Sequence, residues 1–479
     1  MENKLIYNYL FILKSLVQYL PSRVIIVLNS FFIIPLLAYK LNQSEISVFL
    51  IAINILNLIC TCSYDWVAKA VLRFYEKYRI KNELDSFFST VFWIAIAVYL
   101  IIIAVFFAFK DFVTAKFSIE TLTFALVILL VIPCGIRQFL YQLLRIKNRY
   151  WLYTFSIIAY QILFLLGFCY IFKLIQGADS AIITMLIAIA AIDVYITATI
   201  PLNYSVNKGI DTKILKEILK YSLPQIITNS AYWSILHISK FIFQALNQYV
   251  NTSILGVALT LTSNTIQPLA SLFIFVNFPI LIKNFERKYA SFGEFSTNLL
   301  QLYMYLLIPF VFCLSAFAGD ITRLFFPGRY SMVALIIPFF ALTSFLHEFV
   351  KLVNIKYHLN NKTYIEMFII ISVFLLTIGF NIGATIKYQV IGAAAAILIT
   401  ELILAVIHLF VRFKSFNYLE YKKIFRTALY TLINCTICYF ICTLALQGNY
   451  IAMRFARILI FLAMSYFFNY SFRNKILLG

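Results

Sequence analysis

The sequence contains few charged residues, few acids and few histidines. Of its 479 residues only 12% are charged and 63% are hydrophobic, whereas a soluble protein of this size carries roughly twice that charged fraction. The four histidines are scattered, so no His-based nucleophilic site can be argued. A phosphate-cradling glycine-rich loop, a Walker lysine motif and an HExxH motif are also missing. These absences argue against a soluble enzyme and against ATP-driven transport by this chain alone, and no cofactor is expected.

The sequence is instead organised in apolar blocks of about twenty residues, the length that crosses a bilayer as a helix. Its mean hydropathy is +0.91. The blocks predict an all-α polytopic membrane protein with about 14 transmembrane helices. The predicted spans of the first half are 22–41, 45–71, 86–109, 121–144, 151–174 and 180–204. Those of the second half are 221–246, 253–282, 298–317, 332–353, 364–386 and 391–413, and a final pair is 427–446 and 450–470.

Two of these stretches begin and end alike. Tyr-Leu-Pro at 19–21 opens an apolar run that ends in Leu-Asn-Gln at 41–43. Tyr-Ser-Leu-Pro at 221–224 opens another that ends in Leu-Asn-Gln at 246–248. The repeat indicates two related membrane bundles, and the later copy carries Lys240 inside its apolar run.

The net charge of +20 comes mainly from the connectors between spans. Connectors that follow even-numbered spans are basic, as with Arg73, Lys77, Arg79 and Lys81 after the second span, whereas the other connectors carry few cations. Cytoplasmic loops of membrane proteins show this excess of Lys and Arg. The pattern predicts that both termini face the cytoplasm, and it explains the basic charge without nucleic acid as a partner.

Three cations within the spans have no obvious partner on their own helix: Arg23 in the first, Arg137 in the fourth and Lys240 in the seventh. Each costs roughly 2.5–3.5 kcal/mol at the bilayer centre on insertion scales, so each should face a partner or a water-filled cavity. Arg23 and Lys240 could instead extend to an interface, and the span of Arg137 could end earlier. A cavity with unpaired cations suits an anionic cargo such as a phosphate.

Other polar residues of the spans occur at spacings that favour local pairing or packing. Asp65 and Lys69 are four residues apart on one helix face, so they are either a self-neutralising pair or secondary contacts for the anion. Glu348 and Lys351 are expected to pair in the same way. The cysteines of the thirteenth span are spaced like metal ligands but have no His or acidic partners, so no metal site is expected: they are Cys435, Cys438 and Cys442.

Several segments resemble Wzx-type polysaccharide flippases of the multidrug/oligosaccharidyl-lipid/polysaccharide (MOP) exporter superfamily. Residues 380–396, Phe-Asn-Ile-Gly-Ala-Thr-Ile-Lys-Tyr-Gln-Val-Ile-Gly-Ala-Ala-Ala-Ala, are similar to the family pattern N-x3-I-P-x-Y-G-x-x-G-A-A. Leu223-Pro224, Trp233 and Ser239-Lys240 are similar to its L-P…W…D-R segment. The chain departs from the family in three places: Ser239 replaces the acid, Thr385-Ile386-Lys387 replaces the usual Pro before the Tyr-Gly, and Gln389 stands where Gly is common.

This resemblance implies two pseudo-symmetric six-helix bundles, 1–206 and 207–416, and a terminal helix pair and tail at 417–479. It implies a flippase of the bacterial inner membrane that moves undecaprenyl-pyrophosphate-linked oligosaccharide repeat units of O-antigen or capsule from the cytoplasmic to the outer leaflet. The bundles would open alternately to each side. Arg23, Arg137 and Lys240 would contact the pyrophosphate, with Asp65 and Lys69 as secondary candidates. Membrane lipids and the polysaccharide polymerase machinery are the other expected partners.

Two other functions remain open from the sequence. A cation-coupled small-molecule exporter of the same superfamily would use the membrane acids Asp65, Asp193 and Glu401. An O-antigen polymerase is also basic and has many spans, but it would need a long outer loop rich in Arg and His, and the connectors here are short.

Overall fold

The computed structural model describes residues 18–200, 207–286, 292–360, 362–411, 420–446 and 451–477, and these contain helices and turns but no strand. Residues 18–30 form the first described helix. The helices of the first half are α2 (Ile33–Lys40), α3 (Gln43–Cys60), the π-helix η1 (Thr61–Asp65), α4 (Trp66–Ile80), α5 (Leu84–Ala108), α6 (Lys110–Phe117), α7 (Thr121–Ile146), α8 (Tyr150–Leu174) and α9 (Ala178–Thr199). Those of the second half are α10 (Thr212–Ala245), α11 (Tyr249–Glu286), α12 (Phe292–Ala316), α13 (Ala318–Phe325), the 3-10 helix η2 (Gly328–Tyr330), α14 (Val333–Leu359), α15 (Thr363–Phe410), α16 (Tyr421–Ala445) and α17 (Ile451–Leu477).

The helices coincide with the predicted spans. Within the described residues, 11 helices are long and apolar enough to cross a membrane. They contain twelve of the fourteen predicted spans, because α15 includes both 364–386 and 391–413. The other two, 221–246 and 253–282, fall on α10 and α11. The prediction of an all-α polytopic membrane protein is therefore confirmed.

The chain forms two compact units. Unit 1 contains the described residues of Met1–Tyr39, Ile254–Lys362 and Ile386–Gly479, and unit 2 those of Lys40–Ser253 and Thr363–Thr385. The first helix therefore belongs to the unit that holds most of the second-half helices, and α10 belongs to the unit built from α3 to α9. The division into pseudo-symmetric six-helix bundles stays a prediction.

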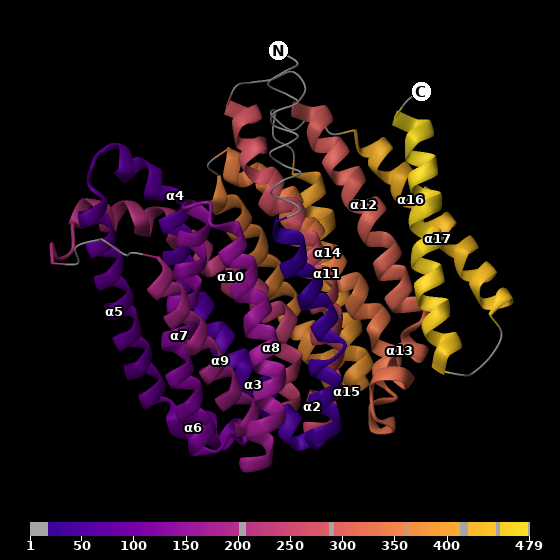
Figure 1. Cartoon of the computed structure of the whole chain (residues 1–479), viewed down its shortest axis with the longest axis horizontal. Helices are drawn as coiled ribbons and strands as arrows, with labels where there is room; N and C mark the ends of the chain where they lie inside the picture. Colours follow the sequence, from indigo (N-terminus) through magenta and orange to yellow (C-terminus); the bar gives the residue numbers. More distant parts are fainter. Residues whose placement is uncertain are drawn as a thin grey trace. The chain divides into compact units, whose positions relative to one another are not determined.

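Unit 2 is built around the antiparallel packing of α10 on the continuous helix α3–η1–α4 (Figure 1). Among the side-chain contacts that join the two helices, four polar ones show their direction, because the residue numbers rise along one helix as they fall along the other. The span from residue 54 to residue 78 corresponds to about 36 Å of helix at 1.5 Å per residue. The contacts are Asn54 with Lys240 at 3.2 Å, Cys62 with Ser230 at 3.2 Å, Asp65 with Asn229 at 3.4 Å, and Tyr78 with Glu217 at 2.7 Å.

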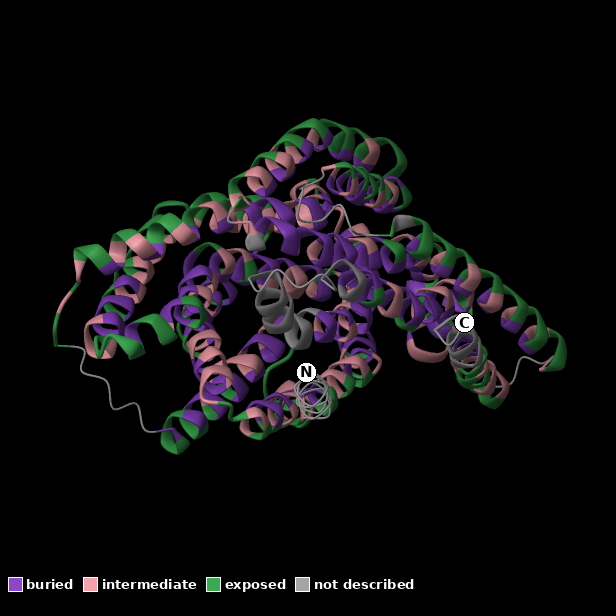
Figure 2. Ribbon diagram, turned by 90° about the horizontal axis from the view of Figure 1, so that it is seen from above, coloured by how far each residue is buried: buried purple, intermediate pink, exposed green. Residues whose placement is uncertain are grey.

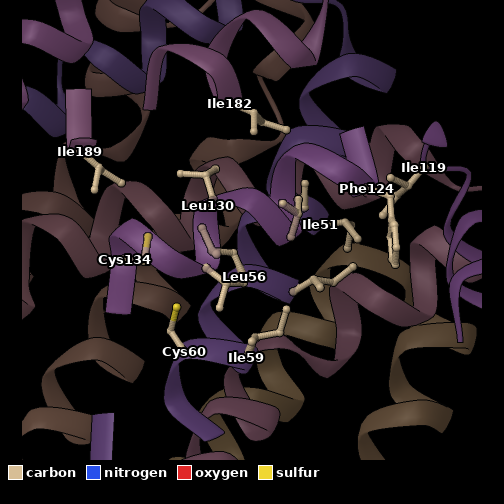
Figure 3. Close-up of a cluster of buried hydrophobic side chains, with 14 of the residues drawn as sticks. Ile51, Leu56, Ile59, Cys60, Ile119, Phe124, Leu130, Cys134, Ile182 and Ile189 are labelled. Atoms are coloured by element: carbon tan, nitrogen blue, oxygen red, sulfur yellow. The ribbon is translucent and has the colours of Figure 1, made fainter. Parts of the chain in front are cut away.

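An apolar cluster from α3, α7 and α9 packs beside this helix pair. Ile51, Leu56, Leu130 and Ile189 are among its buried members (Figure 3). Many helices are buried on one side and exposed on the other (Figure 2), and large apolar side chains such as Phe107 are among the exposed ones. Apolar side chains on the outer face of a helix bundle are suited to contact with lipid.

Asparagines end or begin several helices, and the repeated Leu-Asn-Gln segments use them in different ways. Asn42 caps α3: its side chain accepts from the backbone N–H of Glu45, whose carboxylate accepts from the backbone N–H of Asn42. Asn247 instead follows α10 with a left-handed φ of 58°, as do Asn82 after α4 (58°) and Asn148 after α7 (54°). Asn is one of the few residues besides Gly that adopts this conformation readily.

A single residue breaks the 48-residue helix α15 into two spans. Gln389 has φ 50° and ψ −135°, whereas the residues on either side are helical. This conformation suits Gly, because a side chain there is strained by about 1–3 kcal/mol. Gln389 is also the position at which the sequence departs from the Gly of the family pattern.

We expect Gln389→Gly to raise the apparent Tm of the protein in detergent, because it removes the backbone strain and the replaced side chain is exposed. The gain should be up to about 3 kcal/mol. Ala394→Gly, in the helical part of the same α15, is the matched control and should cost about 1 kcal/mol. A lower Tm for Gln389→Gly would contradict the strain.

The π-helical turn η1 places the ring of Tyr64 against α7. A Cβ added to Gly135 of α7 would lie 2.7 Å from Cδ2 of Tyr64, too close for any side chain. The ring is buried within the α3–α7–α9 cluster. Gly135 therefore permits the close approach of α7 to the point at which α3 passes into α4.

Gly135→Ala should destabilise the protein by about 1–3 kcal/mol, because the buried ring of Tyr64 has to move. Gly383→Ala serves as the control, since a Cβ there meets no atom within 4 Å. Thermal unfolding in detergent measures both. Equal Tm values for the two variants would show that η1 adjusts without cost.

Candidate functional site

The polar side chains that join α10 to α3–η1–α4 form a seam through unit 2, and Lys240 is its buried cation. Lys240 is only 2% exposed, and its Nζ donates to Oδ1 of Asn54 at 3.2 Å. Among the described residues, no carboxylate forms an ion pair with it. The side chain thus does not extend to an exposed interface, and an amide dipole alone offsets its charge.

Further polar and aromatic side chains flank Lys240 on α10. Ser239 accepts a hydrogen bond from the hydroxyl of Thr385 at 3.2 Å. Trp233 lies next to His237, with ring centroids 4.8 Å apart, and next to Phe241 at 5.8 Å. The spacing of four residues places the three rings on one face of the helix. The seam therefore combines a cation with an aromatic surface.

Asp65 and Lys69 form the self-neutralising pair that their spacing predicts. Oδ2 of Asp65 lies 2.7 Å from Nζ of Lys69 and also accepts from the amide of Asn229 on α10 at 3.4 Å. Both side chains are about one-third exposed, and such pairs contribute at most about 1 kcal/mol. The pair contributes no net charge to the seam, and its role as a secondary anion contact stays a prediction.

Arg137 points from α7 toward α8 and α9. Its guanidinium lies 4.9 Å from the centroid of the Tyr160 ring on α8, and Nη2 lies 4.0 Å from Sγ of Cys134. Asp193 of α9 is within electrostatic range. Asp193 is buried, and neither of its carboxylate oxygens makes a hydrogen bond to a described residue. Arg137 therefore has an acidic side chain near it on another helix, which the sequence alone did not indicate, but the two do not form an ion pair.

The structure places the five predicted site residues in two units. Arg23 lies half-buried in the first helix, in unit 1, and the other four lie in unit 2. Within unit 2 they lie at different depths: Lys240 and the Asp65 pair are 11 residues apart along the seam, or roughly 16 Å. A common cavity that holds all five stays a prediction.

Sequence reasoning missed the uncharged partners of these groups. Asn54, Asn229 and Tyr160 each contact a predicted site residue. An amide in the middle of an apolar span, such as Asn54, is a signal that could have been used, because it needs a partner at that depth. The Glu348 and Lys351 pair is confirmed at 2.7 Å, in unit 1.

The fold resembles those of solved transporters. "Lipid II flippase MurJ, inward closed conformation" matches with a TM-score of 0.71 at 17% identity, over 98% of this chain and 100% of that one. The eukaryotic MATE transporter AtDTX14 matches with 0.58 at 10% identity, over 88% and 99%. A MOP superfamily transporter from Pyrococcus furiosus, whose binding pocket is described as having reverse polarity, matches with 0.56 at 14% identity, over 82% and 94%. No protein-family model matches the sequence, and no curated protein matches it.

These likenesses extend over nearly the whole chain and define its class by fold. The chain has the fold of MOP superfamily transporters, in which lipid flippases and MATE exporters share one architecture. A Wzx-type flippase, the family that the sequence resembles, fits this fold.

If Lys240 binds a cargo and does not stabilise the fold, the double variant Lys240→Met and Asn54→Leu should be at least as stable as the natural protein. It removes a buried charge together with its amide partner and should gain up to about 3 kcal/mol in apparent stability. A clear loss of Tm in detergent would make Lys240 a structural residue.

Lys356 provides the matched control, because it is equally buried but has a structural role. Its Nζ donates to the carbonyls of His408 and Val411 at the end of α15, the latter at 2.6 Å. Lys356→Met leaves these carbonyls unsatisfied and should cost at least about 1 kcal/mol.

Proposed function

We infer that this protein is a flippase of the bacterial inner membrane, with both termini in the cytoplasm. Its cargo is an undecaprenyl-pyrophosphate-linked oligosaccharide repeat unit of O-antigen or capsule, which moves from the cytoplasmic to the outer leaflet by alternating access. The observation that carries the proposal is Lys240, a buried cation whose one hydrogen-bond partner among the described residues is the amide of Asn54.

A diphosphate headgroup suits such a cation. Pyrophosphate and sugars cannot enter hydrocarbon unaided, because their polar groups would lose their hydrogen bonds to water. An ammonium or guanidinium group replaces those bonds with charge-assisted ones. In this proposal Lys240, Arg137 and Arg23 contact the diphosphate, and the Asp65–Lys69 pair is a secondary contact. The polyprenyl tail stays in lipid.

The sugars of the cargo would meet the aromatic side chains beside these cations. Trp233 and Phe241 lie on α10 close to Lys240, and Tyr160 lies against Arg137. Aromatic faces pack well on the apolar faces of sugar rings, and aromatic side chains commonly line ligand sites. The likeness to a lipid II flippase over the whole chain supports a lipid-linked cargo.

A cation-coupled exporter of small molecules is the second candidate. The buried carboxylates Asp193 and Glu401 and the MATE transporters among the similar structures favour it. It predicts drug efflux driven by a cation gradient in cells that express the protein. An O-antigen polymerase has less support, because the fold resembles those of transporters.

Deletion of the gene in its host should trap complete single repeat units on the cytoplasmic leaflet, because translocation is the step that is lost. Leaflet-resolved analysis of undecaprenyl-pyrophosphate-linked glycans measures this. Single units on the outer leaflet would overturn the proposal and favour the polymerase. An unchanged glycan pool would also overturn it, and would leave the exporter.

Complementation of the deletion strain tests the residues. The triple variant Arg23→Gln, Arg137→Gln and Lys240→Met should lower surface polysaccharide at least about tenfold, since each charge-assisted hydrogen bond contributes about 1.5–3 kcal/mol. Lys423→Gln, which alters an exposed cation paired with Glu420 at 2.9 Å, is the control and should complement fully. Full complementation by a triple variant that inserts normally would refute this assignment.

A further inference from the structure

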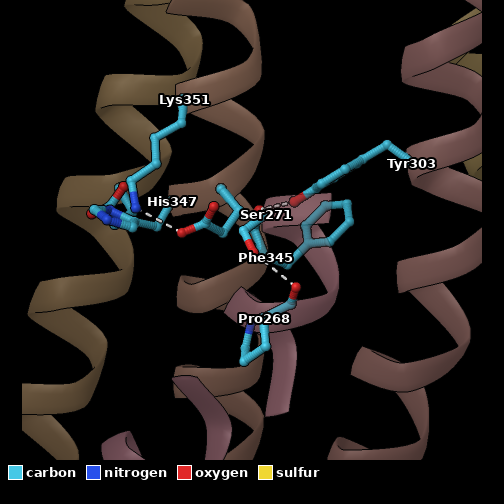
Figure 4. Close-up of polar contacts among 8 residues, drawn as sticks. Pro268, Ser271, Tyr303, Phe345, His347 and Lys351 are labelled. Atoms are coloured by element: carbon cyan, nitrogen blue, oxygen red, sulfur yellow. Dashed lines mark hydrogen bonds and ion pairs between the residues drawn. The ribbon is translucent and has the colours of Figure 1, made fainter. Parts of the chain in front are cut away.

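A second polar seam lies in unit 1, between α14 and the second half of α15. Nδ1 of His347 lies 2.9 Å from Oε1 of Glu401 (Figure 4). Seven residues further along α15, Nδ1 of His408 lies 3.0 Å from the hydroxyl of Tyr357. The two contacts advance in the same direction on both helices, so these helices run parallel. All four side chains are buried.

The pair of His347 and Glu401 is the least accessible ion pair among the described residues. Glu401 is 0% exposed and His347 is 4% exposed. Oε2 of Glu401 makes no hydrogen bond to a described residue. An ionised carboxylate at such a site is costly unless it is paired and hydrogen-bonded. Oε2 of Glu401 is therefore available to bind a proton.

The charged and titratable groups on α14 and on helices of unit 1 that pack with it have other partners. On α14 the carboxylate of Glu348 pairs with Lys351 at 2.7 Å, and Lys356 donates to the carbonyls that end α15. Tyr303 of α12 donates to the carbonyl of Phe345 at 2.7 Å (Figure 4). On α13, Asp320 pairs with Arg454 at 3.5 Å and Arg457 at 3.6 Å of α17. Among these groups, none forms an ion pair with Glu401 apart from His347.

The proton count of the pair sets its charge. With one proton shared between the imidazole and the carboxylate the pair is neutral, with two it carries +1, and with none it carries −1. Among the described residues Glu401 forms no ion pair besides that with His347, so each proton that enters or leaves alters the charge inside unit 1. Imidazole is the side chain whose ordinary titration falls nearest to physiological pH.

Hydroxyl groups lie one helical turn from His347. Thr343 and Ser344 are buried on α14, four and three residues before it, and their hydroxyl oxygens make no hydrogen bond to a described residue. Residues three and four apart lie next to each other on a helix. A hydroxyl both donates and accepts, so these two groups are able to pass a proton to or from the pair.

We propose that His347 and Glu401 form a proton-binding site in the membrane-spanning part of unit 1. A proton from water adds to Oε2 of Glu401 and converts the carboxylate to a carboxylic acid, while the imidazole keeps its own proton and its contact with Oε1. The reverse step returns the proton to water. The site supplies a coupling ion to a transporter of either proposed cargo, so it does not rest on which cargo is right.

Infrared difference spectroscopy of the purified full-length protein in nanodiscs tests the site without any cargo. Protonation of a carboxylate produces a carboxylic-acid C=O band, and a titration between about pH 5 and pH 8 covers the range in which His side chains charge. We expect the buried carboxylic acid of Glu401 to give a band that changes with pH in the natural protein, separate from any band that the buried Asp193 contributes. Glu401→Gln should abolish that band, and His347→Gln should move its midpoint.

Two variants on the same helices are the matched controls. Glu348→Gln removes the adjacent carboxylate, and His408→Gln removes the other buried imidazole of the seam. Both should keep the band and its midpoint. A pH-dependent carboxylic-acid signal that is the same in Glu401→Gln as in the natural protein overturns the proposal, and so does a natural protein without any such signal. Neither result bears on the leaflet distribution of the glycans, so the two proposals fail separately.

Discussion

The interior of a bilayer offers no hydrogen bonds, so each polar group that this chain buries there needs its partner within the protein. The backbone meets this constraint by being helical over nearly all of the described membrane spans. The side chains meet it by gathering at seams between particular helices. In unit 2 the seam joins α10 to α3–η1–α4, and in unit 1 it joins α14 to α15.

Lys240 and Lys356, both buried, show how the chemistry of the partner distinguishes a structural role from a functional one. Lys356 donates to backbone carbonyls that the end of α15 leaves unsatisfied, which is a role in the fold. Lys240 has one amide oxygen as its partner. Since an amide satisfies a hydrogen bond but does not balance a charge, Lys240 is suited to receive an anion. Burial alone does not distinguish the two residues; their acceptors do.

The seams of the two units also differ in charge. In unit 2 the cations include the buried Lys240 and the half-buried Arg137, and the carboxylate of Asp193 near Arg137 makes no hydrogen bond to a described residue. In unit 1 the central pair is an imidazole and a carboxylate, whose charge depends on protons. A cationic seam suits an anionic cargo and a titratable seam suits a coupling ion. Together they give one chain the two kinds of group that gradient-driven transport needs.

The sequence by itself determined the features that depend on one helix. Blocks of about twenty apolar residues predicted the spans because bilayer thickness sets their length. Spacings of four and three residues predicted the pairs of Asp65 with Lys69 and Glu348 with Lys351, since helix geometry places such residues on one face. Only the tertiary structure decided the partners of Lys240, Arg137 and Glu401, because each partner lies on another helix. Packing between segments far apart in the chain decides which helices become neighbours and at what depth they align. The sequence of one helix does not contain this information.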